Sequence, residues 1–435
     1  MKSEWTIMPL SEIVNFNPTY SIKKGTIIPY VEMAAVPENT REIAYFENRE
    51  FSNGSKFKNG DTLFSRITPC LQNGKTARVS GLKESEIANG STEFIVMSAK
   101  DIDDKDFIYY LALNKEFRNY AEGRMEGTTG RQRVSWQALS EYEFLIPPKV
   151  IRQKIAHILS TLDDKIELNR KMNQTLEEMS QTIFKSWFVD FDPVHAKANC
   201  EDEAELENIA KELGISKEIL GLFPSEFTES EMGMIPKGWE VKAISSIGQV
   251  ITGKTPPTTQ KENYGDRYPF ITIPDMHNQV YITKTERYLS DVGNNVQKNK
   301  LIPKNSLIVS CIATVGLISI NSEDSHTNQQ INSIVCDEKN LYYLYFILKN
   351  MKETLIMYGS SGTATLNVNK STFENIEFIK SSDILIQRFF KFVNPIFGDI
   401  LENTKQIQIL EKTRDTLLPK LLSGEIDVSD LELKV

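Results

Sequence analysis

The stretch LDDKIELNRKMNQTLEEMSQTIFKSW, residues 162–187, places an apolar or small polar residue at alternating steps of four and three. The residues at these steps are Leu162, Ile166, Asn169, Asn173, Leu176, Ser180, Ile183 and Trp187. Such spacing is typical of the seam of a coiled coil. The stretch therefore predicts a long helix, over about residues 161–189, that packs along a partner helix.

A second stretch, 234 residues further on, repeats the pattern and supplies the predicted partner. Its seam positions are Ile396, Ile400, Asn403, Ile407, Leu410, Arg414, Leu417 and Leu421. Asn394 and Pro395 are typical of an N-cap followed by proline in the first helical turn, which predicts a helix over about residues 395–422. Residues 160–163 are the equivalent start in the first copy, and a shorter helix is expected before each long one.

An antiparallel pairing of the two helices gives a specific register. Leu162 then meets Leu421, and polar seam residues also meet, with Asn169 facing Arg414 and Ser180 facing Asn403. Buried polar groups are costly without partners, so this coincidence favours the register. It predicts that cysteines at positions 176 and 407 crosslink. The alternative is that each helix packs separately on its own domain.

The same spacing of 234 relates other parts of the chain, which indicates an internal duplication. WTIMPLSEI (residues 5–13) aligns with WEVKAISSI (residues 239–247), and Glu143-Phe144 aligns with Glu377-Phe378. Between these anchors the two copies differ in length and composition. Shared ends with divergent middles predict one framework that carries two different contact surfaces.

Two short motifs suggest catalytic loops, and the duplication argues against both. GQVITGKT (residues 248–255) matches the phosphate-loop pattern, and NPTY (residues 17–20) is close to the N-P-P-Y loop of amino-methyltransferases. They occupy the same place in the two copies. Lys254-Thr255 is followed by two prolines, which disfavour the helix that a phosphate loop must open. We therefore expect neither a nucleotide site nor a methyltransferase site, and no cofactor bound by this chain.

Composition and charge set further limits. At 435 residues, with 40% hydrophobic and 25% charged residues, the chain is typical of a soluble protein of two or three domains. No signal peptide or membrane span is predicted, and the scattered cysteines and histidines indicate neither a disulfide framework nor a metal site, so a cytoplasmic location is expected. The net charge of −9 is concentrated in residues 200–231, with ten acids against two lysines, and in the acidic tail. Basic surfaces elsewhere remain possible.

The predicted fold class is α+β, with two mixed α/β domains separated by an antiparallel two-helix coiled coil in a pseudo-twofold repeat. Short β-branched runs bounded by Gly and Asn predict strands in each copy, followed by short helices over about residues 105–121 and 340–358. Two domains with different contact surfaces, joined by a shared pair of helices, would suit a protein that binds two separated segments of DNA.

Three stretches of the chain carry a resemblance to a known family. GTTGRQRVSWQALSEYEFLIPP (residues 127–148), the helical stretch RQKIAHILSTLDDKIELNRKMNQTLEEMSQTIFKSWFVDFDP (residues 152–193) and the linker LFPSEFTESEMGMIPKGWEV (residues 222–241) resemble the specificity subunit of type I restriction-modification enzymes. The second closing stretch, LPKLLSGEI, departs from FKSWFVDF of the first, so its far end is expected to pack differently.

The resemblance implies a non-catalytic subunit that recognises a bipartite double-stranded DNA target and docks two methyltransferase subunits, which restriction subunits join. S-adenosylmethionine and ATP are then expected on those partners. It also implies a division of the chain into target recognition domains, conserved helical regions and acidic connectors. These are recognition domains 1–149 and 237–383, helical regions 150–190 and 384–423, an acidic linker 191–236 and an acidic tail 424–435.

Loops rich in Arg, Lys, Asn and Gln are the candidate DNA contacts, because these side chains bind phosphates and base edges. In the first domain the candidates are Arg66, Gln72, Asn73, Lys75, Arg131, Gln132 and Arg133. In the second domain they are Lys254, Thr258, Gln260, Lys261, Asn328, Gln329, Gln330, Asn367, Asn369 and Lys370. Two alternatives stay open: a specificity module of another methyltransferase-nuclease system, and a coiled-coil scaffold that binds no DNA.

Overall fold

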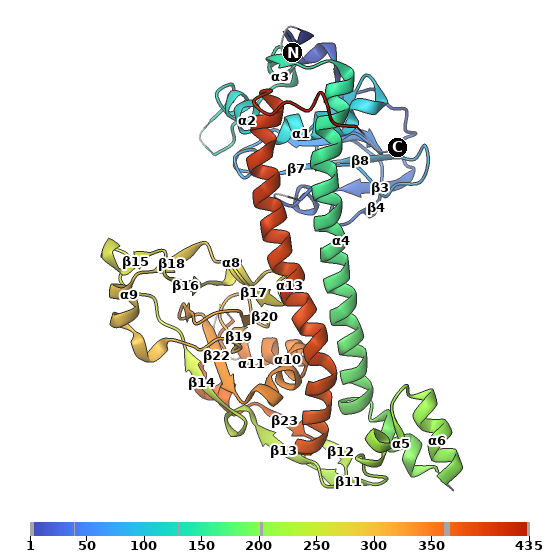
Figure 1. The fold of residues 1–435 in the computed structure, drawn as a ribbon, viewed down its shortest axis with the longest axis vertical. Coiled ribbons are helices and arrows are strands. Elements are labelled where there is room, and N and C mark those ends of the chain that lie inside the picture. Colours follow the sequence, from blue (N-terminus) through green and yellow to red (C-terminus); the bar gives the residue numbers. More distant parts are fainter. Residues whose placement is uncertain (1–3, 39, 129, 201–202, 361–365, 433–435) are drawn as a thin grey trace. The chain divides into compact units, whose positions relative to one another are not determined.

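The computed structural model forms two compact units, each with a mixed α/β domain and a share of two long helices (Figure 1). It describes the chain from residue 4 to residue 432, without residues 39, 129, 201–202 and 361–365. Unit 1 comprises residues 1–168 and 407–435, and unit 2 comprises residues 169–406. The predicted α+β class and the division into two domains are confirmed.

Unit 1 contains two four-stranded sheets and a separate strand pair. The first sheet has the order β2 (Val14–Phe16), β9 (Phe94–Ala99), β6 (Thr62–Ser65) and β7 (Thr76–Arg78). The second has the order β4 (Glu47–Glu50), β3 (Ile27–Val31), β8 (Ile87–Gly90) and β5 (Ser55–Lys58). The antiparallel pair is β1 (Thr6–Pro9) with β10 (Glu143–Ile146).

Helices cover the first sheet of unit 1 and complete its core. They are α1 (Lys105–Leu113), α2 (Lys115–Glu122) and α3 (Trp136–Ser140). The single helix expected over residues 105–121 is split at Asn114, whose side chain accepts a hydrogen bond from Glu116 N and so starts α2 as its N-cap. Residues 107–112 of α1 are all buried, because this helix lies within the core rather than on its surface.

Unit 2 repeats this plan with extra strands. Its first sheet has the order β14 (Gly248–Thr252), β22 (Ile331–Cys336), β19 (Leu307–Ser310), β20 (Ile318–Asn321) and β17 (Tyr281–Ile282). Its second sheet has the order β15 (Tyr264–Gly265), β18 (Arg287–Leu289), β16 (Tyr268–Ile271) and β21 (His326–Thr327). The pair β13 (Glu240–Ala243) with β23 (Glu377–Lys380) matches β1 with β10 strand for strand, as the alignment of Glu143 with Glu377 predicted.

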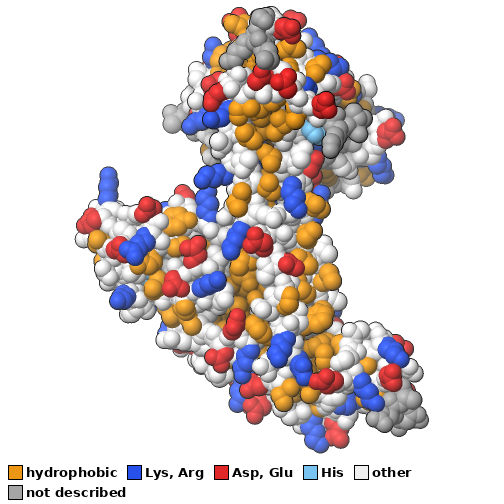
Figure 2. Space-filling view, in the orientation of Figure 1, with side chains coloured by type: hydrophobic (Ala, Val, Ile, Leu, Met, Phe, Trp, Pro, Cys, Tyr) orange, Lys and Arg blue, Asp and Glu red, His pale blue; other side chains and the backbone are white. Residues whose placement is uncertain are grey.

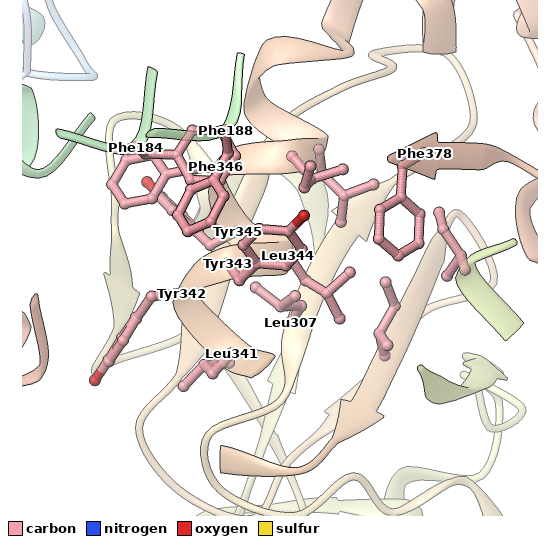
Figure 3. Packing of buried hydrophobic residues seen from close by; sticks show 14 of the residues in the cluster. Phe184, Phe188, Leu307, Leu341, Tyr342, Tyr343, Leu344, Tyr345, Phe346 and Phe378 are labelled. Atoms are coloured by element: carbon pink, nitrogen blue, oxygen red, sulfur yellow. The ribbon is translucent and has the colours of Figure 1, made fainter. Parts of the chain in front are cut away.

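The domain of unit 2 contains an aromatic core and several short helices. They are α8 (Ile273–Met276), α9 (Asp291–Val296), α10 (Leu341–Asn350), α11 (Lys352–Gly359) and α12 (Lys370–Glu374). Figure 3 shows Phe184 and Phe188 of the first long helix packed against Phe346 of α10. The ring of Phe184 is fully buried and lies 5.4 Å from that of Phe346. Burial of such rings commonly contributes about 3–5 kcal/mol each, measured as the cost of truncation to alanine.

Each long helix is continuous over 40 residues, which corrects the predicted starts. They are α4 (Lys149–Phe188) and α13 (Asp383–Leu422). Thr161 Oγ1 donates a hydrogen bond to His157 O, four residues back within α4, so it does not cap a new helix. Asn394 Oδ1 accepts a hydrogen bond from the Tyr342 hydroxyl, and Pro395 is tolerated inside α13 rather than beginning it. In the described part of the chain, no helix has an apolar stretch of membrane-spanning length.

The two helices pair antiparallel in both units, but the predicted register is wrong. In unit 2, Asn403 Nδ2 donates to Asn173 Oδ1 at 2.9 Å, seven residues from the expected partner Ser180. Asn169 bonds Gln406 rather than Arg414. In unit 1, Arg414 Nη1 instead donates to Asp163 Oδ1 at 2.8 Å.

The buried Asp163 explains the shift. Its side chain is 3% exposed and also accepts a hydrogen bond from the Tyr110 hydroxyl at 2.7 Å. An unpaired carboxylate in such a place is costly, so Arg414 lies opposite Asp163. The spacing of apolar residues along the sequence does not indicate that Asp163 needs a charged partner. The predicted seam residues still face inward: Ile166, Asn169, Ser180, Ile400, Arg414 and Leu421 are buried, and Leu162, Leu176, Ile183, Ile396, Asn403, Ile407, Leu410 and Leu417 are partly buried.

The acidic linker and tail belong to the folded units. The linker contains α5 (Asp192–Ala198), α6 (Glu203–Glu212), α7 (Lys217–Gly221) and the strand pair β11 (Phe227–Ser230) with β12 (Gly233–Pro236). Its residues Val194 and Phe223 are buried in the core of unit 2. In the tail, Val428 is buried in the core of unit 1, where α4 also holds the tail through a bond from Lys154 Nζ to Ser429 O.

Candidate nucleic-acid interface

Three loops meet at one end of the first sheet in each unit. In unit 1, Ser65 at the end of β6 pairs with Phe94 at the start of β9, and in unit 2 Ser310 of β19 pairs with Ile331 of β22. The loops that leave or enter these strands, together with a third loop, contain most of the predicted contact residues. We call this arrangement the loop frame; it comprises residues 66–75, 91–93 and 126–134 in unit 1 (residue 129 lies outside the described residues).

The loop frame is built from backbone hydrogen bonds that recur in the two units. Arg66 N donates to Glu93 O in unit 1, and Cys311 N donates to Gln330 O in unit 2. The third loop closes the frame in the same way in both units. Val134 N donates to Arg66 O, and Val368 N donates to Cys311 O.

Side chains therefore fall into matched pairs on a common backbone. Arg66 corresponds to Cys311 and Glu93 to Gln330. Arg133 corresponds to Asn367, because each forms an isolated β-bridge with the residue that follows the first matched position, Ile67 and Ile312 respectively. The loop frame of unit 2 thus comprises residues 311–316, 327–330 and 366–369. Matched positions with different side chains would allow two domains with the same loop backbone to bind different ligands.

The charged pair Arg133–Glu93 dominates the loop frame of unit 1. Arg133 Nε lies 3.0 and 2.9 Å from the two carboxylate oxygens of Glu93, and Arg133 Nη2 lies 2.6 Å from Glu93 Oε1. This pair raises the pKa of Arg133 above its ordinary value, first through the hydrogen bond with Glu93. Arg133 was predicted as a candidate contact, whereas Glu93 was missed because an acid does not bind phosphate.

The other candidates of unit 1 differ in how free they are. Arg131 and Gln72 are exposed, and Gln132 is partly buried. Asn73 donates to Glu38 Oε1 at 2.9 Å, and Lys75 donates to Met33 O at 3.0 Å. Arg66 is partly buried, and among the described residues its Nε has no acceptor. The predicted loops of unit 1 lie together in the structure, although several of the candidate side chains are already engaged in the fold.

Most candidates of unit 2 lie on the loop frame or on the neighbouring loop 253–260, whereas Lys261 begins a short 3-10 helix and Lys370 begins α12. Asn328 Nδ2 donates to Gln330 Oε1 at 3.0 Å, and Gln329 Oε1 accepts a hydrogen bond from Thr255. Asn369 caps α12, and Lys370 pairs with Glu374 in the same helix. The remaining candidates are exposed: Lys254, Thr258, Gln260, Lys261 and Asn367.

The two motif matches have structural roles. Residues 253–260 open no α-helix, so Lys254 and Thr255 lack the helix N-terminus that a phosphate loop needs, as predicted. Asn17 of NPTY adopts a left-handed backbone with φ of 47°, and its side-chain oxygen accepts a hydrogen bond from Val96 N. With Asn53 and Lys56, this loop lines a hollow of about 380 Å³ beside Thr92 of the loop frame.

A buried histidine supports the loop frame of unit 2. His326 of β21 lies parallel to β16 and contacts Asn294 Oδ1 at 2.9 Å through Nε2. Its matched residue in unit 1 is Asn89, which lies parallel to β3 in the same register. Burial lowers the pKa of His326 to about 4, so the ring is neutral at pH 7.

Comparison with known proteins decides the family. The family model described as type I restriction modification DNA specificity domain matches residues 2–178 and 236–380. This chain belongs to the family of type I restriction-modification specificity subunits. The specificity subunit is 43% identical to the type I restriction enzyme HindI specificity subunit of Haemophilus influenzae, over 85% of this chain and 87% of the relative. It is 29% identical to the MjaIX specificity subunit of Methanocaldococcus jannaschii, over 75% of this chain and 70% of the relative.

Solved structures support the fold. The crystal structure of a type I restriction-modification S subunit from M. genitalium has a TM-score of 0.54 with this specificity subunit, at 14% identity and with 96% of both chains covered. The fold class and family inferred from the residues are thereby confirmed. The individual contact residues, the domain limits implied by the resemblance and the partners stay predictions.

Proposed function

We propose that each domain of this specificity subunit reads one half of an asymmetric, bipartite DNA target. The observation that carries the proposal is the loop frame: one backbone arrangement, present in both units, with different side chains at matched places. A shared frame allows both domains to approach DNA in the same way. Different side chains, such as Arg133 and Asn367, then select different bases.

The two-helix pair, in this proposal, sets the spacing between the half-targets and docks two methyltransferase subunits. Its polar contacts support a fixed register, because Asn173–Asn403 and Asp163–Arg414 each require a particular alignment of α4 with α13. Exposed apolar residues on the same helices support docking: Met172 and Met179 of α4 are 42% and 53% exposed, and Ile409 of α13 is 65% exposed.

Catalysis belongs to the partners in this proposal. The methyltransferase subunits bind S-adenosylmethionine and methylate the DNA, and restriction subunits that use ATP join the larger complex in the cytoplasm. The candidate contacts on the loops stay candidates for phosphate and base binding. On the face drawn in Figure 2, Lys and Arg side chains are interspersed with Asp and Glu, so local loops rather than one broad basic surface are expected to hold the duplex.

Sequencing of methylated bases tests the proposal. Cells that carry this chain with its methyltransferase should show methylation at one interrupted, asymmetric motif, and cells with the chain deleted should show none. Exchange of the loop-frame side chains of unit 1 should alter one half of the motif only. An unchanged methylation pattern after deletion would contradict the proposal and favour the scaffold alternative, and methylation at an uninterrupted motif would favour a module of another methyltransferase-nuclease system.

A further inference from the structure

The guanidinium of Arg133 is held in place and still presents two donors. Arg133 has five N–H donors in a planar fork. Its Nε and one N–H of Nη2 bond Glu93, and one N–H of Nη1 donates to Arg131 O at 3.3 Å. Among the described residues, one N–H on each terminal nitrogen is left without an acceptor. The side chain is 40% exposed, so these donors can reach a ligand.

The partner Glu93 makes a phosphate an unfavourable ligand for this fork. A phosphate contact depends on net positive charge, and the carboxylate of Glu93 neutralises the charge of Arg133. The remaining donors do not depend on net charge: each terminal nitrogen keeps one N–H in the plane of a guanidinium that Glu93 holds in one orientation. That geometry matches the O6 and N7 acceptors of guanine in the major groove, which a bidentate arginine reads. Glu93 also lowers the entropy lost on binding, because it holds the long side chain in one orientation.

The matched places in unit 2 have different chemistry. Gln330 takes the place of Glu93, and Asn367 takes the place of Arg133. Both are neutral amides, and Asn328 orients the side chain of Gln330 through a bond from Asn328 Nδ2 to Gln330 Oε1, while the backbone N of Gln330 donates to Asn328 Oδ1. An amide offers one donor and one acceptor side by side, which suits the N6 and N7 atoms of adenine.

We propose that Arg133, oriented by Glu93, reads a guanine in one half of the DNA target, and that the matched amides Gln330 and Asn367 read an adenine in the other half. This inference rests on the proposed function of the two domains. Glu93 is a positioning residue in it, and Arg133 is the residue that contacts the base. The same backbone place is therefore the base-selecting position in both domains.

The test is selection of bound duplexes from a randomised DNA library by the purified full-length chain, followed by sequencing. For Arg133→Lys, which keeps the charge and loses the fork, preference for guanine at one position should fall about tenfold or more, since a good bidentate contact discriminates by about 1–3 kcal/mol. Glu93→Gln should weaken the same preference to a smaller extent. Arg49→Lys, at an exposed arginine that pairs with Glu47 outside the loop frame, is the matched control and should leave every base preference unchanged. Asn367→Ala should weaken an adenine preference in the other half.

Each variant contains its own control for folding, because the half-target read by the unaltered domain should stay as in the parent chain. A uniform loss of affinity for all sequences in Arg133→Lys would identify a phosphate contact and overturn the inference. A guanine preference that survives Arg133→Lys would also overturn it. If the parent chain selects no sequence at all, the proposed function itself fails, and this result is distinct from the other two.

Discussion

The two domains share the main-chain arrangement of the loop frame and differ in the side chains that it carries. Unit 1 places ionised groups at its decisive positions: Arg133 with Glu93 in the loop frame, and Asp163 with Arg414 between the helices. Unit 2 uses amides at the matched loop places and between its helices, as in Asn173 with Asn403. The comparison teaches that a duplicated fold can preserve main-chain hydrogen bonds while its side-chain chemistry changes from ionic to neutral.

The largest expected effect comes from removal of the buried charge in unit 1. The side chain of Arg414 is only 4% exposed, and Asp163→Ala removes its buried partner. We therefore expect unit 1 to lose about 3–5 kcal/mol of unfolding free energy. Hydrogen exchange should show the loss in α1 and in the parts of α4 and α13 that belong to unit 1. Glu178→Ala, at an exposed site on α4, is the control and should change stability little. Equal loss of protection in both units would contradict this separation.

A smaller difference should appear with pH, because unit 2 alone has a histidine at the matched place of Asn89. The pKa of His326 is lowered from 6.5 to about 4 by burial, so the unfolded chain binds a proton more readily than the folded one. The stability that His326 contributes is full above pH 6.5 and is lost as the pH falls from about 6.5 towards 4. The loss should be on the order of 2–3 kcal/mol.

Denaturant unfolding at pH 7 and pH 4.5, followed by a probe in unit 2, measures this loss. His326→Asn installs the side chain of unit 1 and should remove most of the acid sensitivity of unit 2. An equal acid response in the parent and the variant would assign the effect to other groups.

The amide pair between the helices of unit 2 should contribute less than the ion pair of unit 1. Asn173→Ala removes the hydrogen bonds with Asn403 and Thr404, and we expect a loss of about 1–2 kcal/mol in thermal or denaturant unfolding. A loss as large as that of Asp163→Ala would break the contrast between ionic and neutral contacts.

Crosslinking tests the register itself. In a chain without its native cysteines, Asn173→Cys with Asn403→Cys should form a disulfide readily, since the parent side chains are in contact. Leu176→Cys with Ile407→Cys should not, because the observed register is shifted by seven residues from the one that pairs them. The reverse outcome would restore the register expected from the apolar repeat.

The smallest expected effect concerns salt dependence of DNA binding. If Arg131 and Lys254 contact phosphates, each change to alanine should lower the slope of log affinity against log salt by about one. Arg133→Ala should lower it less, because Glu93 already neutralises this charge. Equal slopes for Arg131 and Arg133 would favour the simpler interpretation in which both side chains contact phosphates.

Much of the fold followed from patterns in the chain. The spacing of 234 predicted the matching of β1 with β13 and of β10 with β23, and the four-three spacing predicted two long helices whose seam residues face inward. Helix starts were wrong because Thr161 and Pro395 are ambiguous signals: a hydroxyl can bond back within a helix, and proline can be tolerated inside one. Most loop residues of the candidate site were found by composition, but Glu93 was not, since its role depends on a neighbour 40 residues away.

The sequence by itself determined the duplication, the two helices and the divergence of the contact loops, because periodicity and repeat spacing are written along the chain. Only the tertiary structure decided the helix register, the pairing of Arg133 with Glu93 and the matched places of the two domains. These depend on which polar groups are buried together. Burial makes each such group require a particular partner, and the identity of that partner is a property of the folded chain.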